Sequence, residues 1–127
     1  MRIDHIAMVV TDIEAAKNFF TKYFGAVANE MYHNPKTGLK TYFLHFDGNT
    51  RLEIMQFPNL TDNNLQQPAT GYCHLAISTG SKQKVDETTA RLRADGFHVV
   101  SGPRTTGDGY YESCVEAIES NLIEITE

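Results

Sequence analysis

The stretch Gly71-Tyr72-Cys73-His74-Leu75-Ala76-Ile77-Ser78-Thr79 decides how this chain is expected to fold. Its small and β-favouring residues, bounded by turn-forming residues such as Pro68 and Gly80, predict a strand. A similar stretch, Asp4-His5-Ile6-Ala7-Met8-Val9-Val10-Thr11, stands near the start of the chain. In both, a histidine is followed by an apolar residue, an alanine and a second apolar residue. The sequence therefore predicts an internal duplication that opens twice with the same strand.

The duplication extends to the end of each copy. Arg51-Leu52-Glu53-Ile54-Met55 closes the first copy, and Asn121-Leu122-Ile123-Glu124-Ile125 closes the second. Each copy thus carries one histidine on its opening strand and one glutamate on its closing strand, at nearly equal separations. Imidazole and carboxylate groups together suit borderline divalent ions such as Zn, Ni, Co, Mn or Fe. The pattern therefore favours a metal site made from His5, Glu53, His74 and Glu124.

Length and composition limit the possible function classes. The chain has 127 residues, of which 41% are hydrophobic, and a net charge of −5, so one compact domain is expected, without the basic surface of a nucleic-acid-binding protein. No apolar run is long enough to span a membrane. Met1-Arg2-Ile3-Asp4 is predicted to lead straight into a strand, so no signal peptide is expected. Two cysteines, Cys73 and Cys114, do not make a disulfide framework. A cytoplasmic protein is the expectation.

The first copy, residues 1–57, is expected to have the order β-α-β-β-β. Strands are predicted at 3–10, 27–33, 41–47 and 51–57, with a hairpin turn at Asp47-Gly48-Asn49. Thr11 and Glu14 fit a capping box at the start of the helix, which ends at Gly25. Residues 58–70 lack periodicity and are predicted to be a linker between the copies.

The second copy, residues 71–127, repeats this order. Ser81 is predicted to cap a helix that runs to about Asp95, with Val85, Thr88, Thr89 and Leu92 inward. Strands are predicted at 72–78, 97–101, 110–115 and 122–126, and a loop at 102–109. The fold class is therefore α+β, with two tandem βαβββ modules in a single domain that spans residues 1–127.

The alternation of side chains along a strand predicts where the candidate ligands point. In the first copy, Ile6, Met8 and Val10 are expected to face the helix, which leaves His5 and Glu53 on the opposite face of the sheet. His74 and Glu124 are expected to lie in the same way in the second copy. Two such sheets facing each other would bring the four donors together, either within one chain or between two chains.

Taken together, these residues resemble the vicinal oxygen chelate superfamily, the glyoxalase/bleomycin resistance/dioxygenase-like proteins, over essentially the whole chain. The resemblance is carried by the segments His5–Val10, Tyr23–Gly25, Leu52–Ile54, His74–Ile77 and Leu122–Ile125. It implies a single glyoxalase-like domain with a curled, barrel-like mixed sheet and its helices outside. It also implies one divalent ion per site, Ni or Zn first and Co, Mn or Fe as alternatives, in a homodimer whose sites are shared across the interface.

The implied activity is that of a lyase, similar to lactoylglutathione lyase, or of an isomerase. Such an enzyme acts on a small α-oxygenated carbonyl compound or its thiol conjugate, by proton abstraction and a metal-stabilised enediolate. Glu124 is the first candidate for the base and Glu53 the second. Arg51, Tyr72, Tyr110 and Glu112 are candidates for lining the substrate pocket.

The sequence departs from the glutathione-using members of this superfamily in two places. Val9 stands four residues after the first histidine, where those enzymes usually have an arginine, so glutathione recognition is in question. Ala117-Ile118-Glu119-Ser120-Asn121 replaces the usual turn before the last strand.

Several alternatives stay open on the sequence alone. The chain could be a non-catalytic resistance protein that binds an antibiotic or another small molecule, or a thiol transferase or dioxygenase of the same fold. Glu53 could pair with Arg51 in a salt bridge instead of binding an ion. The residues 107–112 could be a substrate lid or an ordinary glycine turn. His33, His45 and His98 are expected to be surface or sheet residues. Cys114 could border a pocket, although packing is the expected role.

Overall fold

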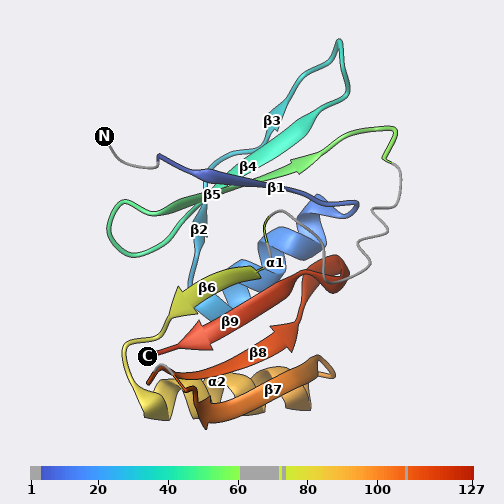
Figure 1. Ribbon diagram of the computed structural model, residues 1–127. Helices are drawn as coiled ribbons and strands as arrows, with labels where there is room; N and C mark the ends of the chain where they lie inside the picture. Colours follow the sequence, from blue (N-terminus) through green and yellow to red (C-terminus); the bar gives the residue numbers. More distant parts are fainter. Residues whose placement is uncertain (1–3, 61–71, 73, 108) are drawn as a thin grey trace. The chain divides into compact units, whose positions relative to one another are not determined.

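The computed structural model describes residues 4–60, 72, 74–107 and 109–127, and it divides the chain into two compact units, 1–65 and 66–127. The predicted linker at 58–70 and Cys73 therefore fall largely or wholly outside the described residues. Each unit is a sheet with one helix (Figure 1). Of the helices in the described part of the chain, none is both long and apolar enough to cross a lipid bilayer.

The first unit contains one α-helix and five strands. Its elements are β1 (Ile6–Val9), α1 (Ile13–Phe24), β2 (Val27–Ala28), β3 (Tyr32–His33), β4 (Lys40–His45) and β5 (Arg51–Gln56). The strand order is β1-β5-β4-β2, and β3 also pairs with β4. β1 runs parallel to β5, whereas the other pairs are antiparallel. The first and last strands of the unit are therefore neighbours.

The second unit repeats this topology. Its elements are β6 (His74–Ser78), α2 (Lys82–Ala94), β7 (His98–Thr105), β8 (Tyr111–Glu116), η1 (Ile118–Ser120) and β9 (Leu122–Thr126). The strand order is β6-β9-β8-β7, with β6 parallel to β9. The α+β class and the duplicated βαβββ order are confirmed.

Each helix covers one face of its own sheet. Ile13, Ala16, Phe19 and Phe20 of α1 are buried, as are Leu44, Leu52 and Ile54 on β4 and β5. In the second unit the buried residues are Val85, Thr89 and Leu92 of α2 together with Val115, Ile123 and Ile125. The Thr89 hydroxyl lies 2.6 Å from both the Val85 carbonyl and the Ser113 hydroxyl, so this buried polar pair is satisfied. Thr88, also predicted inward, is only half-buried.

The N-terminus of α1 differs from the prediction. Asp12, not Thr11, is the N-cap, and its side chain accepts a hydrogen bond of 2.9 Å from the Ala15 backbone N–H. Glu14, predicted to complete a capping box, instead accepts a hydrogen bond of 2.7 Å from the Tyr42 hydroxyl on β4. The Glu14 carboxylate therefore binds Tyr42 of β4, whereas the local pattern predicted that it would bind the backbone at the start of the helix.

Three strand predictions also need correction. The segment predicted as one strand at 27–33 forms two short strands, because the Asn29 side chain accepts the Phe43 N–H at 2.7 Å where the ladder would continue. The predicted loop at 102–109 begins too early, since β7 reaches Thr105, and a register shift between Ser101 and Arg104 accommodates Gly102 and Pro103. Ile6 was expected under α1 but is 42% exposed, because β1 is the edge strand.

Gly102 lies where β7 passes close to β8. Its φ is +79°, and a Cβ built on it would lie 2.4 Å from the Glu112 carbonyl oxygen. Gly102→Ala is expected to lower the free energy of unfolding by about 2 kcal/mol or more, because backbone strain and a steric overlap add. Gly25→Ala is the matched control, since Gly25 has φ +66° and open space around its Cβ position. Equal losses for the two variants in urea unfolding would contradict the close approach.

Glu14 makes stability depend on pH. Its pKa lies below the ordinary value of 4.5, chiefly because Lys17 and then the Tyr42 hydroxyl donate to it. A depressed pKa contributes stability above 4.5 that is lost as pH falls through the folded-state value. Glu14→Gln is expected to show a smaller drop in Tm between pH 6 and pH 3 than the wild type. Glu30→Gln, at an exposed position between β2 and β3, is the control, and an unchanged drop in Glu14→Gln would disprove the linkage.

Candidate functional site

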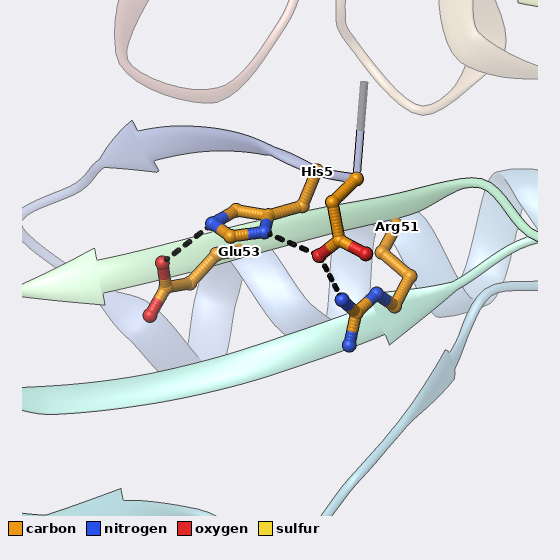
Figure 2. A network of polar contacts seen from close by, with 4 residues as sticks. His5, Arg51 and Glu53 are labelled. Atoms are coloured by element: carbon orange, nitrogen blue, oxygen red, sulfur yellow. Dashed lines mark hydrogen bonds and ion pairs between the residues drawn. The ribbon is translucent and has the colours of Figure 1, made fainter. Parts of the chain in front are cut away.

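The first candidate pair lies on the face of the first sheet opposite α1. Across the parallel pair, Ala7 of β1 is in register with Glu53 of β5, and His5 lies two residues earlier on the same face. His5 Nε2 is 3.6 Å from Glu53 Oε2 (Figure 2). The flanking residues Leu52 and Ile54 are buried on the helix face, which fixes the direction of Glu53.

The second unit reproduces this pair. Ala76 of β6 is in register with Glu124 of β9, and His74 Nε2 lies 3.1 Å from Glu124 Oε2. The side-chain exposures also match, at 36% and 37% for the histidines and 17% and 22% for the glutamates. The duplication therefore extends from the backbone to the donor atoms.

The 3.1 Å separation in the second unit fits two ligands of one ion, and the 3.6 Å separation in the first unit is slightly longer than such a pair requires. Zn–N and Zn–O bonds of about 2.1 Å place neighbouring donors roughly 3.0 to 3.4 Å apart for bond angles between 90° and the tetrahedral value. In the first unit, 3.6 Å is too long for a direct hydrogen bond between His5 Nε2 and Glu53 Oε2. Among the described residues, no group of three or more His, Cys, Asp or Glu side chains is placed to hold an ion. A four-donor site therefore stays a prediction.

His5 has charged and aromatic neighbours that the repeat did not predict. Its Nδ1 lies 2.9 Å from Asp4 Oδ2, and the same carboxylate forms an ion pair with Arg51. The pKa of Asp4 lies below its usual range because His5 first, and then Arg51, donate to it. The His5 ring also meets the Phe43 ring edge-on, with centroids 5.2 Å apart. Arg51, considered above as a partner for Glu53, has its described ion pair with Asp4.

Glu124 has different neighbours. Cys114 of β8 is in register with Glu124, at the place that Phe43 of β4 takes across from Glu53. Cys114 is half-buried. The same sheet carries a second histidine–glutamate pair, with His98 Nδ1 3.4 Å from Glu116 Oε2. Hydrogen bonds from Ser120 and then His98 lower the pKa of Glu116.

The candidate pocket residues lie at exposed or half-buried positions. Tyr72 and Tyr110 are 94% and 59% exposed. Glu112 is half-buried on β8, two residues from Cys114 and on the same face. Thr106 and Tyr110 close a turn between β7 and β8, with the Thr106 N–H 2.8 Å from the Tyr110 carbonyl. The pocket role of these residues, and the proposed lid at 107–112, stay predictions.

Sequence reasoning missed Asp4 and Phe43. Asp4 directly precedes His5, and that adjacency was the available signal. Phe43 follows from the hairpin register, since it lies opposite Glu53 in the β4–β5 pair. Phe43 therefore lies beside Glu53 because of how β4 and β5 pair, and the pattern of hydrophobic residues does not predict that pairing.

Comparison with known proteins places the chain in a family. The family described as "Glyoxalase/Bleomycin resistance protein/Dioxygenase superfamily" matches residues 2–125. YqjT of Bacillus subtilis is 28% identical over 125 residues, which cover 95% of this chain and 94% of that protein. Mouse mitochondrial methylmalonyl-CoA epimerase is 32% identical over 71 residues, which cover 56% of this chain.

Other matches are partial. YwkD of Bacillus subtilis is 28% identical over 82 residues, or 65% of this chain. The matched stretches span 64% of YwkD and 36% of the mouse epimerase, which is less than two thirds of either relative.

Solved structures share the fold. A glyoxalase family protein from Bacillus cereus has a TM-score of 0.85 at 20% identity, covering 100% of this chain and 93% of that one. FosX, a fosfomycin resistance protein from Listeria monocytogenes solved with Mn(II) and sulfate, has a TM-score of 0.73 at 19% identity, covering 98% and 90%. At these identities the likeness concerns the fold alone. With the family match over nearly its whole length, the chain belongs to the glyoxalase/bleomycin resistance protein/dioxygenase superfamily, which has the vicinal oxygen chelate fold.

Proposed function

We propose that this protein is a metal-dependent lyase or isomerase of the glyoxalase type, acting on a small α-oxygenated carbonyl compound or its thiol conjugate. The observation that carries the proposal is the repeated pair of a histidine Nε2 and a glutamate Oε2, 3.6 Å apart in one unit and 3.1 Å in the other. The partial match to an epimerase and the Mn(II) in a fold relative support this reaction class.

His5, Glu53, His74 and Glu124 would hold one divalent ion, Ni or Zn first. The donor set fits, because two imidazoles and two carboxylates suit such ions. A bound ion would supply Lewis-acid stabilisation of the negative charge that develops on a substrate carbonyl oxygen. We further propose that the protein is a homodimer in which each site takes two ligands from each subunit.

Glu124 is the proposed base. It takes the proton from the carbon next to the substrate carbonyl, while the C–H electron pair moves toward the carbonyl oxygen. The neighbours of the two glutamates favour this choice over Glu53. Glu124 lies across from Ala76 and Cys114, which are both small residues. Glu53 lies between Ala7 and the bulky Phe43, and its side chain is 17% exposed, against 22% for Glu124.

The substrate thiol, if there is one, need not be glutathione, since Val9 occupies the position of the usual arginine. Arg51 was a candidate for binding substrate, but its ion pair with Asp4 favours a supporting role. Tyr72, Tyr110 and Glu112 are retained as candidates for contacting the substrate.

The metal site can be tested by binding alone. Titration of chelator-treated protein with Ni²⁺ or Zn²⁺ is expected to show one tight site per chain, which His74→Ala and Glu124→Ala weaken by at least 100-fold. His98→Ala and Glu116→Ala are matched controls, because they remove another histidine–glutamate pair from the same sheet. Undiminished binding in His74→Ala and Glu124→Ala would overturn the assigned ligands. Stabilisation by an aromatic drug, with none by metal, would instead favour a non-catalytic binding protein.

The role of the base can be tested by deuterium exchange. Metal-loaded protein in D₂O is expected to exchange the proton next to the carbonyl in members of a panel of α-hydroxy ketones, hemithioacetals and thioesters, followed by NMR. Glu124→Gln is expected to lower the exchange rate by about 10²- to 10⁴-fold, because the amide cannot take the proton. Glu53→Gln is expected to lower it less at saturating metal, and Glu116→Gln not at all. A larger loss in Glu53→Gln would reverse the assignment of the base.

A further inference from the structure

Asp4 connects His5 to Arg51. One carboxylate oxygen, Oδ2, lies 2.9 Å from His5 Nδ1 and also forms the ion pair with the Arg51 guanidinium (Figure 2). The same histidine ring directs its other nitrogen, Nε2, toward Glu53. Asp4 and Arg51 therefore engage His5 through Nδ1, which would stay free if a metal ion bound Nε2.

This arrangement selects one form of the imidazole. A neutral histidine has one N–H donor and one nitrogen with a free lone pair. If Nδ1 donates its proton to the Asp4 carboxylate, the lone pair is on Nε2, next to Glu53. Metal-binding histidines commonly donate their second ring N–H to a carboxylate, which fixes the tautomer and the ring orientation.

Phe43 packs against the His5 ring, and Arg51 pairs with the Asp4 carboxylate. The planes of the His5 and Phe43 rings meet at 89°, so the two rings are packed edge to face. The Arg51 guanidinium lies over the Phe43 ring, 4.9 Å from its centroid. Arg51 therefore packs on Phe43 while it pairs with Asp4. Both of these residues contact His5, so Arg51 is connected to His5 through them.

We propose that Asp4 is a positioning residue for His5, held in place by Arg51, and that it fixes the ring so that Nε2 is the metal donor. The proposal rests on the proposed function, because it concerns one of the four assigned ligands. It assigns Arg51 to the support of a ligand and not to direct binding of an anionic substrate.

The second unit is an internal comparison. Cys73 precedes His74 in the sequence, where Asp4 precedes His5. In the second unit, Leu122 is in register with His74. In the first unit, the corresponding place is taken by Arg51, because Ile6 pairs with Leu52 and the preceding residues are His5 and Arg51. A cysteine and a leucine cannot form a carboxylate–guanidinium pair. The support by Asp4 and Arg51 is therefore particular to His5.

The first test follows the tautomer of His5 in metal-free protein. Long-range ¹H–¹⁵N NMR spectra distinguish Nδ1–H from Nε2–H imidazoles, and His5→Ala identifies the signal of His5. Wild type is expected to have His5 as the Nδ1–H form. Asp4→Ala is expected to show a mixture of the two forms, and Asp4→Glu is expected to restore part of the preference for Nδ1–H. The control is Asp86→Ala, which removes the partner of the Tyr111 hydroxyl and is expected to leave the tautomer of His5 unchanged. An unchanged His5 tautomer in Asp4→Ala would overturn the proposal.

The second test measures affinity for Ni²⁺ or Zn²⁺ by calorimetry. Asp4→Ala is expected to weaken binding by about 10- to 100-fold at unchanged stoichiometry. Arg51→Met is expected to weaken it less, and the double variant no more than Asp4→Ala, because Arg51 acts through Asp4. Additive losses would show that Arg51 acts independently. A raised KM with unchanged metal affinity in Arg51→Met would assign that residue to the substrate.

These outcomes separate the two proposals. If wild-type protein binds no divalent metal, the proposed function fails, while the NMR measurement still decides whether Asp4 sets the tautomer of His5. If wild type binds metal and Asp4→Ala binds it equally well, the positioning role fails and the proposed function stands.

Discussion

The structure depends on the parallel pairing between the first and last strands of each unit. This pairing sets β1 beside β5 and β6 beside β9, and in both units an alanine two residues after the histidine lies opposite the glutamate. The helix covers the alternate residues, so the histidine and the glutamate are left on the open face. Residues separated by about fifty positions in the chain thereby place their donor atoms within a few ångströms.

The two units share this backbone but differ in the side chains around it. In the first unit, Asp4, Arg51 and Phe43 surround the histidine with a charged pair and an aromatic ring. In the second unit, small residues lie beside the glutamate. Under the proposed function, one copy would hold a ligand firmly, while the other would leave space for the substrate.

The places where sequence reasoning failed have several physical causes. At Glu14 and Asn29, polar side chains had several possible partners, and contacts with β4 selected among them. At the start of α1 the choice lay between two adjacent residues, and Asp12 caps the helix through a local bond to Ala15. At Gly102 and Pro103, a strand continued through residues that usually end one, because a register shift accommodates them. Ile6 was predicted inward from alternation, which cannot show that its strand lies at the edge of the sheet.

The sequence by itself determined the duplicated α+β order, the two helices and the face on which each histidine and glutamate lies. Periodicity and repeat are sufficient for these, because they depend only on which residues must leave water. The distances between donor atoms, the Asp4–Arg51 pair and the ring beside His5 were decided by the tertiary structure alone. They follow from which strands pair and in which register, and residues far apart in the chain carry no local signal of that choice.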